Sequence, residues 1–401
     1  MRPSTFADIS ILLALWFMMF AASSQTIIMT PILPIVEAQF DVPREYLGAL
    51  VSAYSIMLGL CALITGPLSD AMGRRRILMI GTGAMCVTLF MHSFVSDLAS
   101  LLLIRSLSGV AAGILSGVAP AYIGDHFPPE RRGWANGVVM TAVAVGQIVG
   151  IPGGTILADR FGFAAPFVCF AAPMVLSFVL VWRLARQPAV ARAHITSIGS
   201  VVRRYASMFT TPATAAAVGA YCMMFSGIAF YVIYLVVWIK ETYGVSSDEV
   251  ASLFVVAGIA SVIVGPWAGR LSDRIGRKVL VVGGCLGLFV LMTLTTVIMT
   301  DFWIAYPLFF AIMVLVSARM GPFQALLSEI VPAQRRGSLM SLGIATGQLA
   351  MGLCSAAAGV VYTEVGYVFS SVIGGMGMLA MGLIIWRFIP ETRHAARPRT
   401  R

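Results

Sequence analysis

Residues 66–76 read GPLSDAMGRRR, and this stretch lies between two long apolar runs. Residues 269–278 read GRLSDRIGRK, so the pattern returns after an offset of 203 residues, half of the chain. A glycine at each end predicts that two helices reverse in a very short loop, because glycine adopts positive φ without steric cost. The carboxylate suits a helix N-terminus, and the basic cluster would hold the loop at one membrane face. One copy would be a polar reverse turn, whereas two copies predict a duplicated chain.

A second pair of motifs supports the duplication. Residues 127–134 read FPPERRGW and residues 331–338 read VPAQRRGS, with an offset of 204 residues. Because two separate motifs share nearly one offset, the helices between them are expected to correspond.

The composition excludes a soluble globular protein. Of 401 residues, 59% are hydrophobic and 11% are charged, with a mean hydropathy of +0.91. Ordinary soluble domains carry about 25% charged residues. Uninterrupted apolar runs are typical of membrane helices, whereas barrels show alternating segments of about ten residues. The chain is therefore predicted to be an all-α membrane protein.

The apolar runs predict twelve spans in two groups of six. We expect a six-helix bundle over 1–184, a linker over 185–211 with a possible amphipathic surface helix, a second bundle over 212–390 and a basic tail over 391–401. The spans lie approximately at 8–35, 45–69, 76–95, 98–124, 133–157, 163–184, 212–239, 247–269, 279–299, 302–328, 337–361 and 366–389.

The charges predict the orientation. Three of the 27 basic residues lie on one side of the predicted spans (Arg44, Arg160 and Lys240), two lie inside spans, and the remaining 22 lie on the other side. Basic residues gather on cytoplasmic segments, so both termini are expected in the cytoplasm. This placement also argues against nucleic-acid binding as the reason for the net charge of +10.

The doubled loop resembles the signature of the major facilitator superfamily, which follows the second and eighth helices of those proteins, and the resemblance covers nearly the whole chain. It implies two pseudo-symmetric six-helix bundles with a substrate cavity where they meet near the middle of the membrane. It also implies a cytoplasmic conformational latch between the halves. The matching positions are Gly66, Asp70, Gly73, Arg74, Gly269, Asp273, Gly276 and Arg277.

Helix 4 contains RSLSGVAAGILSG at residues 105–117. This resembles a family motif in which an arginine precedes spaced glycines and is linked to proton coupling, which implies roles for Arg105 and Gly109. An ionised side chain at the centre of a span costs at least about 2.5 to 3.5 kcal/mol and usually faces a polar interior. Arg105 lies in the outer third of its helix, so reaching the membrane interface is the alternative.

Helix 5 contains GQIVGIPGG at residues 146–154. It resembles the helix 5 motif of drug/proton antiporters, with the proline one position late, as in the sugar-efflux and purine-efflux branch. Glycines at 146, 150 and 154 permit tight helix contact, and Pro152 removes a backbone hydrogen bond. We expect a kink at Gly146, Gly150, Pro152 and Gly154.

The buried polar residues bear on the substrate. Residues 25–34, QTIIMTPILP, resemble an antiporter motif in which an aspartate stands at the place of Gln25, and no acid lies deep in the predicted spans. Coupling through a helix 1 carboxylate is therefore in doubt.

Arg319 lies deep in helix 10, and a buried arginine held by carbonyls freed at Pro322 is the alternative to a ligand contact. Two buried arginines favour an anionic or neutral polar substrate. The expected substrate contacts are Gln25, Tyr54, Tyr231, Arg319 and Gln324.

These observations predict a transporter. We expect a monomeric transporter in a bacterial-type inner membrane that exports a small organic solute or drug in exchange for protons, or alternatively takes up an organic anion with protons. The sequence contains no G-x-S-x-G, H-E-x-x-H or Walker pattern, so we expect no enzyme activity. The six cysteines and four histidines are isolated, so we expect no metal site or cofactor.

Overall fold

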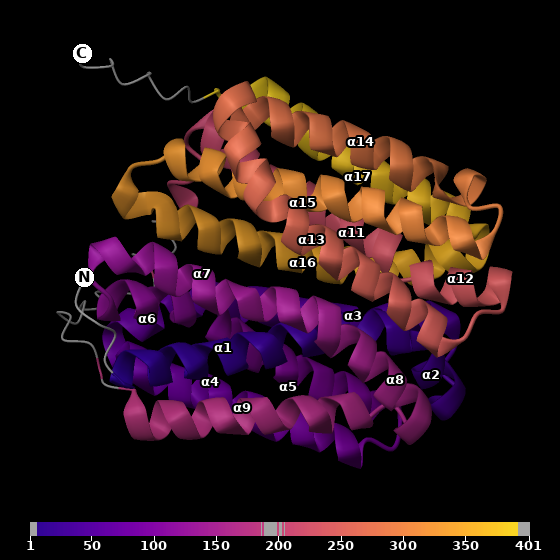
Figure 1. Ribbon diagram of the computed structural model, residues 1–401, viewed down its shortest axis with the longest axis horizontal. Helices are drawn as coiled ribbons and strands as arrows, with labels where there is room; N and C mark the ends of the chain where they lie inside the picture. The colour runs from indigo at the N-terminus through magenta and orange to yellow at the C-terminus, as the bar shows by residue number, and fades with distance from the viewer. Residues whose placement is uncertain (1–5, 186, 188–198, 200–202, 204, 392–401) are drawn as a thin grey trace.

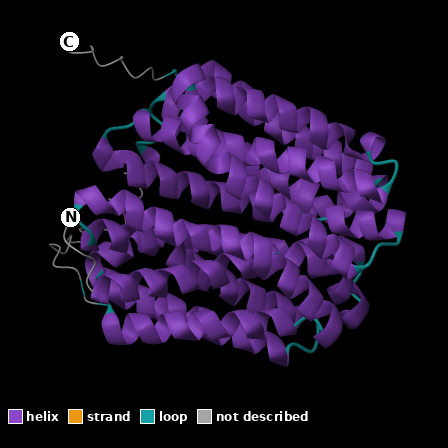
Figure 2. Cartoon of the chain, viewed as in Figure 1, coloured by secondary structure: helices purple, strands orange, loops and turns teal. Residues whose placement is uncertain are grey.

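The computed structural model describes residues 6–185, 187, 199, 203 and 205–391. Helices and short connections make up this part of the chain, which contains no strand (Figure 2). Twelve helical segments within it are long and apolar enough to cross a membrane, as predicted. The fold class expected from the sequence is confirmed.

The first six spans are built from eleven elements. They are α1 (Phe6–Ile27), α2 (Met29–Phe40), α3 (Arg44–Met72), α4 (Arg74–Met91), η1 (His92–Phe94), α5 (Leu98–Ser116), α6 (Val118–His126), α7 (Pro129–Val145), η2 (Gly146–Gly150) with α8 (Ile151–Phe161), and α9 (Ala165–Leu184). We call this group the N half.

The other six spans form the C half. Its elements are α11 (Pro212–Val232), α12 (Leu235–Tyr243), α13 (Ser247–Ile275), α14 (Arg277–Ile298), η3 (Phe302–Ile304), α15 (Ala305–Glu329), α16 (Ala333–Val365) and α17 (Tyr367–Phe388). Most of the segment between α9 and α11 lies outside the described residues, so the surface helix predicted there is not placed.

The helix packing of the N half recurs in the C half. Helix α3 packs on α5 as α13 packs on α15, α4 packs on α9 as α14 packs on α17, and α1 packs on α7 as α11 packs on α16. Between the halves, α3 packs along α16 and α13 packs along α8 and η2 (Figure 1). The duplication read from the sequence is therefore present in the packing.

The two ends of the molecule differ in charge. Helices α2, α8 and α12 lie together at one end, on the right in Figure 1, and α2 contacts both of the others. Glu37, Asp159 and Glu241 belong to these helices, and we call this the acidic end. The opposite end carries the turns at Gly73 and Gly276 with their arginines, and we call it the basic end.

The doubled turn consists of one residue in each half. Gly73 has φ +97° and Gly276 has φ +104°, and each ends one long helix and starts the next. A side chain is strained in this region, which explains the glycine. The expectation for the first glycine of each motif is wrong, because Gly66 and Gly269 lie inside α3 and α13, where regular helix needs no such freedom.

Helix α5 begins with a reciprocal cap at the acidic end. The Ser100 backbone N–H donates to Asp97 Oδ1 at 2.7 Å, and the Ser100 hydroxyl lies 3.2 Å from the Asp97 backbone N. Hydrogen bonding to the carboxylate, first from the Ser100 backbone and then from its side chain, lowers the pKa of Asp97. The cap fixes the start of the helix that carries Arg105.

Candidate functional site

A buried polar cluster lies inside the N half. Four side chains from α1, α3 and α5 form it, and we call it the Arg105 cluster: Gln25, Thr26, Tyr54 and Arg105. An Arg105 Nη1–H donates to Gln25 Oε1 at 3.3 Å, and the Arg105 guanidinium carbon lies 4.4 Å from the centre of the Tyr54 ring. Arg105 and Gln25 are fully buried. Arg105 therefore does not reach the membrane interface, and that alternative is wrong.

The cluster forms one chain of hydrogen bonds. Gln25 Nε2 donates to the Tyr54 hydroxyl at 2.9 Å, and this hydroxyl lies 2.7 Å from Thr26 Oγ1. Thr26 Oγ1 donates to the Ala22 carbonyl at 2.7 Å, so Tyr54 is the donor to Thr26. All donors thus point away from Arg105, which leaves the oxygen of Gln25 to face the guanidinium.

Arg105 has no counter-charge in the part of the chain that the structure describes. None of its hydrogen bonds or ion pairs there involves a carboxylate, and its buried Nε has no hydrogen-bond partner. A buried charge without a partner is costly, because the desolvation of the ion is not offset. The amide of Gln25 and the face of Tyr54 offset only part of this cost.

His92 is a second buried group near this cluster. Its Nδ1–H donates to the Thr88 carbonyl at 2.8 Å, and its ring stacks on Phe167 with ring centres 3.9 Å apart. Among the described residues its buried Nε2 has no hydrogen-bond partner. The ring lies within electrostatic range of the positive charge of Arg105. In the sequence it is one of four isolated histidines, a pattern that predicts neither its burial nor its contacts.

Close packing of α3 on α5 positions Tyr54 and Arg105. A Cβ added at Gly109 would lie 2.2 Å from the Tyr54 carbonyl oxygen, which is far inside van der Waals contact. Only glycine therefore allows the two backbones to approach this closely. Gly109 lies one helical turn after Arg105, so the close contact also holds the arginine against α3.

Arg319 lies inside the C half, away from α3 and α8. Its Nη1 lies 3.2 Å from the sulfur of Met381, its Nη2 lies 3.6 Å from the sulfur of Met378, and its buried Nε has no partner. Both methionines belong to α17, and the Arg319 side chain also packs on Gly284 of α14. Its contacts are thus thioethers rather than the carbonyls considered as the alternative. Substrate contact by Arg319 stays a prediction.

The other expected substrate contacts are split between the two halves. Gln25 and Tyr54 join Arg105, as described above. Tyr231 is buried in the C half, where its hydroxyl lies 2.9 Å from Thr295 Oγ1, and Gln324 is exposed on α15. The structure therefore brings together the N-half residues and does not bring the C-half residues to them.

The helix 5 motif packs against α1. A π-helical turn at Gly146–Gly150 interrupts the fifth span, immediately before Pro152. Cβ atoms added at Gly146 and Gly150 would lie 2.7 Å from Ser23 Oγ and 2.2 Å from Ser24 Oγ, and one added at Gly154 would lie 2.8 Å from Ile28. The glycines therefore permit close contact with the helix that carries Gln25.

Polar contacts join the two halves at the acidic end. We call this set the acidic-end seam; it comprises Arg44, Gly48, Ser52 and Asp159 of the N half and Tyr234, Glu241, Ser247 and Gly352 of the C half. Arg44 forms an ion pair with Glu241. The Tyr234 hydroxyl donates to the Arg44 carbonyl at 2.8 Å and accepts from the Gly48 N–H at 3.0 Å. Because these pairs link different halves, the seam joins the halves at this end.

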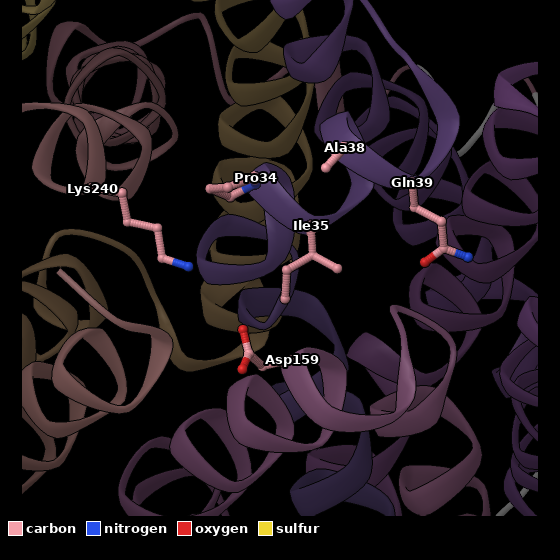
Figure 3. Close-up of a pocket in the computed structure, with 6 residues that line it drawn as sticks. All are labelled: Pro34, Ile35, Ala38, Gln39, Asp159 and Lys240. Atoms are coloured by element: carbon pink, nitrogen blue, oxygen red, sulfur yellow. The ribbon is translucent and has the colours of Figure 1, made fainter. Parts of the chain in front are cut away.

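Two further contacts belong to the seam. The Ser52 hydroxyl donates to the Gly352 carbonyl at 2.5 Å, and the Ser247 hydroxyl donates to Asp159 Oδ1 at 2.5 Å. Lys240 Nζ donates to the same Ser247 oxygen at 2.8 Å. Lys240 and Asp159 line one surface hollow of about 380 Å³, which they face from different halves (Figure 3).

An ion pair supports the turn at the basic end of each half. Arg74 Nε donates to Asp125 Oδ2 at 2.8 Å, and Arg277 pairs with Glu329. The side chains of Asp70 and Asp273 are outside the described part of the structure, so the predicted latch role of these aspartates stays a prediction. The partners Asp125 and Glu329 were missed, although their separation of 204 residues equals the offset of the second motif pair.

A residue after the sixth helix of each half contacts the same turn. The Arg75 N–H donates to Gln187 Oε1 at 3.1 Å, and the Lys278 N–H donates to Glu391 Oε1 at 3.4 Å. Gln187 and Glu391 are again separated by 204 residues. The two turns are thus built alike, with an amide in one half and a carboxylate in the other.

Comparison with known proteins gives consistent matches. The family model for the Major Facilitator Superfamily matches residues 15–237 and 216–401. The uncharacterized MFS-type transporter YceJ of Bacillus subtilis is 24% identical over 378 residues, covering 93% of this chain and 95% of YceJ. The multidrug resistance protein MdtG of Proteus mirabilis is 26% identical over 337 residues, covering 79% of this chain and 81% of MdtG.

A solved structure shares the fold. The xylose transporter XylE from E. coli, in a partially occluded inward-open conformation, superposes with a TM-score of 0.78 at 18% identity. The match covers 97% of this chain and 99% of XylE. At this identity the likeness concerns the fold alone.

Proposed function

Because the chain belongs to the major facilitator superfamily of transporters, we propose that it exports a small organic solute in exchange for protons by alternating access. Alternating access moves one half against the other around a site between them. The observation that carries this proposal is the acidic-end seam, where side chains of both halves meet and would have to separate for the pathway to open at that end.

The direction of transport rests on the relatives and on charge. MdtG is named a multidrug resistance protein, which supports export. We place the basic end in the cytoplasm of an inner membrane, because basic residues gather on cytoplasmic segments. The acidic-end seam then faces outward. While this seam is closed, the protein would receive solute from the cytoplasm.

Proton-coupled uptake of an organic anion is the second candidate. Arg105 favours it, since it has no carboxylate partner in the described part of the chain and such a buried cation suits a solute that brings its own negative charge. Coupling through a helix 1 carboxylate has no support, because Gln25 occupies that position in the cluster.

Flux in membrane vesicles tests both candidates. Everted vesicles expressing the protein are acidified inside and given ethidium as a cationic probe and radiolabelled benzoate as an anionic probe. Export predicts accumulation of a probe that nigericin abolishes by collapsing the pH gradient. Accumulation above that of vesicles lacking the protein, seen only in right-side-out vesicles under an inward proton gradient, would support uptake instead, because undissociated benzoic acid also crosses a bilayer unaided. Accumulation that ignores nigericin would contradict proton coupling.

A further inference from the structure

We propose that the solute carries a carboxylate or a similarly compact anionic group, and that this group binds Arg105 in the N half. The proposal rests on the transport function proposed above and adds the chemical class of the solute. It concerns binding alone, so it can be tested apart from the direction and the coupling of transport.

Two hydrogen-bond donors on α5 lack acceptors. Among the residues that the structure describes, buried Arg105 Nε has no hydrogen-bond partner, and neither has the buried hydroxyl oxygen of Ser108, one helical turn further along α5. Positions three residues apart lie on the same side of a helix. Donors without acceptors, next to a positive charge without a carboxylate, are what an anion would satisfy.

The present hydrogen bond between Arg105 and Gln25 could be replaced by a stronger one. Gln25 Oε1 accepts from Arg105 at 3.3 Å, which is long for a hydrogen bond to a charged group. A carboxylate would accept two parallel hydrogen bonds from the planar guanidinium, usually at shorter distances. A lipophilic cation would instead place a second positive charge beside Arg105.

The position of the cluster suits a transported ligand. Tyr54, which the Arg105 guanidinium covers, contacts Gly109 of α5, and Ser52 on the opposite side of α3 donates its hydroxyl to Gly352 of the other half. The cluster is therefore one helix, α3, away from the surface along which the halves meet. Arg319 differs, because its contacts lie on α14 and α17, which pack within the C half.

Binding of benzoate to the purified protein in detergent tests the proposal. Its seven tryptophans report unfolding by intrinsic fluorescence, and benzamide serves as the uncharged counterpart of benzoate. We expect benzoate, and not benzamide, to raise the unfolding temperature in a saturable way, since a ligand that binds only the folded state stabilises it. Neither probe needs to be transported for this result.

Three variants locate the effect. Arg105→Gln is expected to weaken benzoate binding by more than about tenfold, because a charge-assisted bond is lost. Arg105→Lys keeps the charge without the planar guanidinium, so its affinity for benzoate should lie between that of Arg105→Gln and that of the parent. Arg160→Gln removes an exposed arginine of α8 and should keep the benzoate shift. Each variant is first shown to unfold cooperatively without benzoate.

The other outcomes overturn the proposal. It is wrong if benzoate gives no shift, if benzamide gives an equal shift, or if the shift survives Arg105→Gln. Loss of the shift in Arg160→Gln as well would show that the effect is not specific to Arg105, which also overturns the proposal. A benzoate shift that depends on Arg105, together with failure of both vesicle experiments, would keep the binding site while refuting the transport function.

Discussion

Arg74 Nε lies 2.8 Å from Asp125 Oδ2, and this ion pair joins the turn after α3 to the end of α6. The same relationship recurs between Arg277 and Glu329 in the C half. Both members of each pair are only partly exposed, so solvent screens them less than a surface pair. Each half thus fixes its basic-end turn through a carboxylate more than fifty residues away.

Replacing Asp125 should slow transport. Asp125→Asn leaves Arg74 without this carboxylate. The conformation that contains the ion pair then loses about 1 to 2 kcal/mol of stabilisation, a factor of roughly 5 to 30 in the balance between conformations. Glu329→Gln should have a similar effect through Arg277. Flux in vesicles at matched protein amount measures this. Asp248→Asn, which removes an exposed charge at the acidic end, is the control, and equal rates for Asp125→Asn and this control would contradict the prediction.

A side chain at Gly109 should force α3 and α5 apart. Gly109→Ala places a Cβ 2.2 Å from the Tyr54 carbonyl oxygen, and overpacking of this kind costs about 1 to 3 kcal/mol. We expect a lower unfolding temperature and reduced flux. Gly117→Ala is the matched control, because a Cβ at Gly117 meets nothing within 4 Å. The packing argument fails if both variants melt like the parent.

Locking the acidic-end seam should stop transport. Cysteines at Asp159 and Ser247, in a variant whose six native cysteines are replaced, would link α8 to α13 across the halves. Oxidation is expected to abolish flux and reduction to restore it, because the acidic end can no longer open. The two single-cysteine variants control for oxidation itself. Undiminished flux through the oxidised double variant would show that this end does not move.

The cap of α5 should make stability depend on pH at the acidic end. The pKa of Asp97 is lowered in the folded state, so the ionised cap stabilises the protein above the unfolded-state pKa of about 3.9, and this contribution is lost as the pH falls through the folded-state pKa. Asp97→Ala should unfold at a lower temperature than the parent near neutral pH, and the difference should shrink in acid.

Asp97→Asn separates the cap from its titration. Asparagine caps helices about as well as aspartate does, so this variant should keep most of the stability while losing the pH-dependent part. Unfolding temperatures measured from neutral pH to below pH 4 decide this. A constant difference between Asp97→Ala and the parent across that range would contradict the role of the carboxylate.

Much of the fold could be predicted from the sequence, and much less of the site. Gly73 and Gly276 were identified because positive φ restricts the residue type, and this signal is local. Arg105 and Gln25 were each singled out, but their contact joins residues 80 positions apart. Asp125 and Glu329 were missed, because each pairs with an arginine more than fifty residues away. The seam between Arg44 and Glu241 was missed, since each residue resembles an ordinary charge at the membrane surface.

The sequence alone determined the membrane environment, the number of spans and the duplication, because apolar length and repeated motifs are properties of contiguous residues. Only the tertiary structure decided which polar groups meet. It gave Arg105 an amide and an aromatic face in place of a carboxylate, placed Arg319 against the two methionines of α17, and joined the halves at the acidic end. Hydrogen bonds and ion pairs act over a few ångströms, so the packing of distant helices determines which partners each side chain reaches.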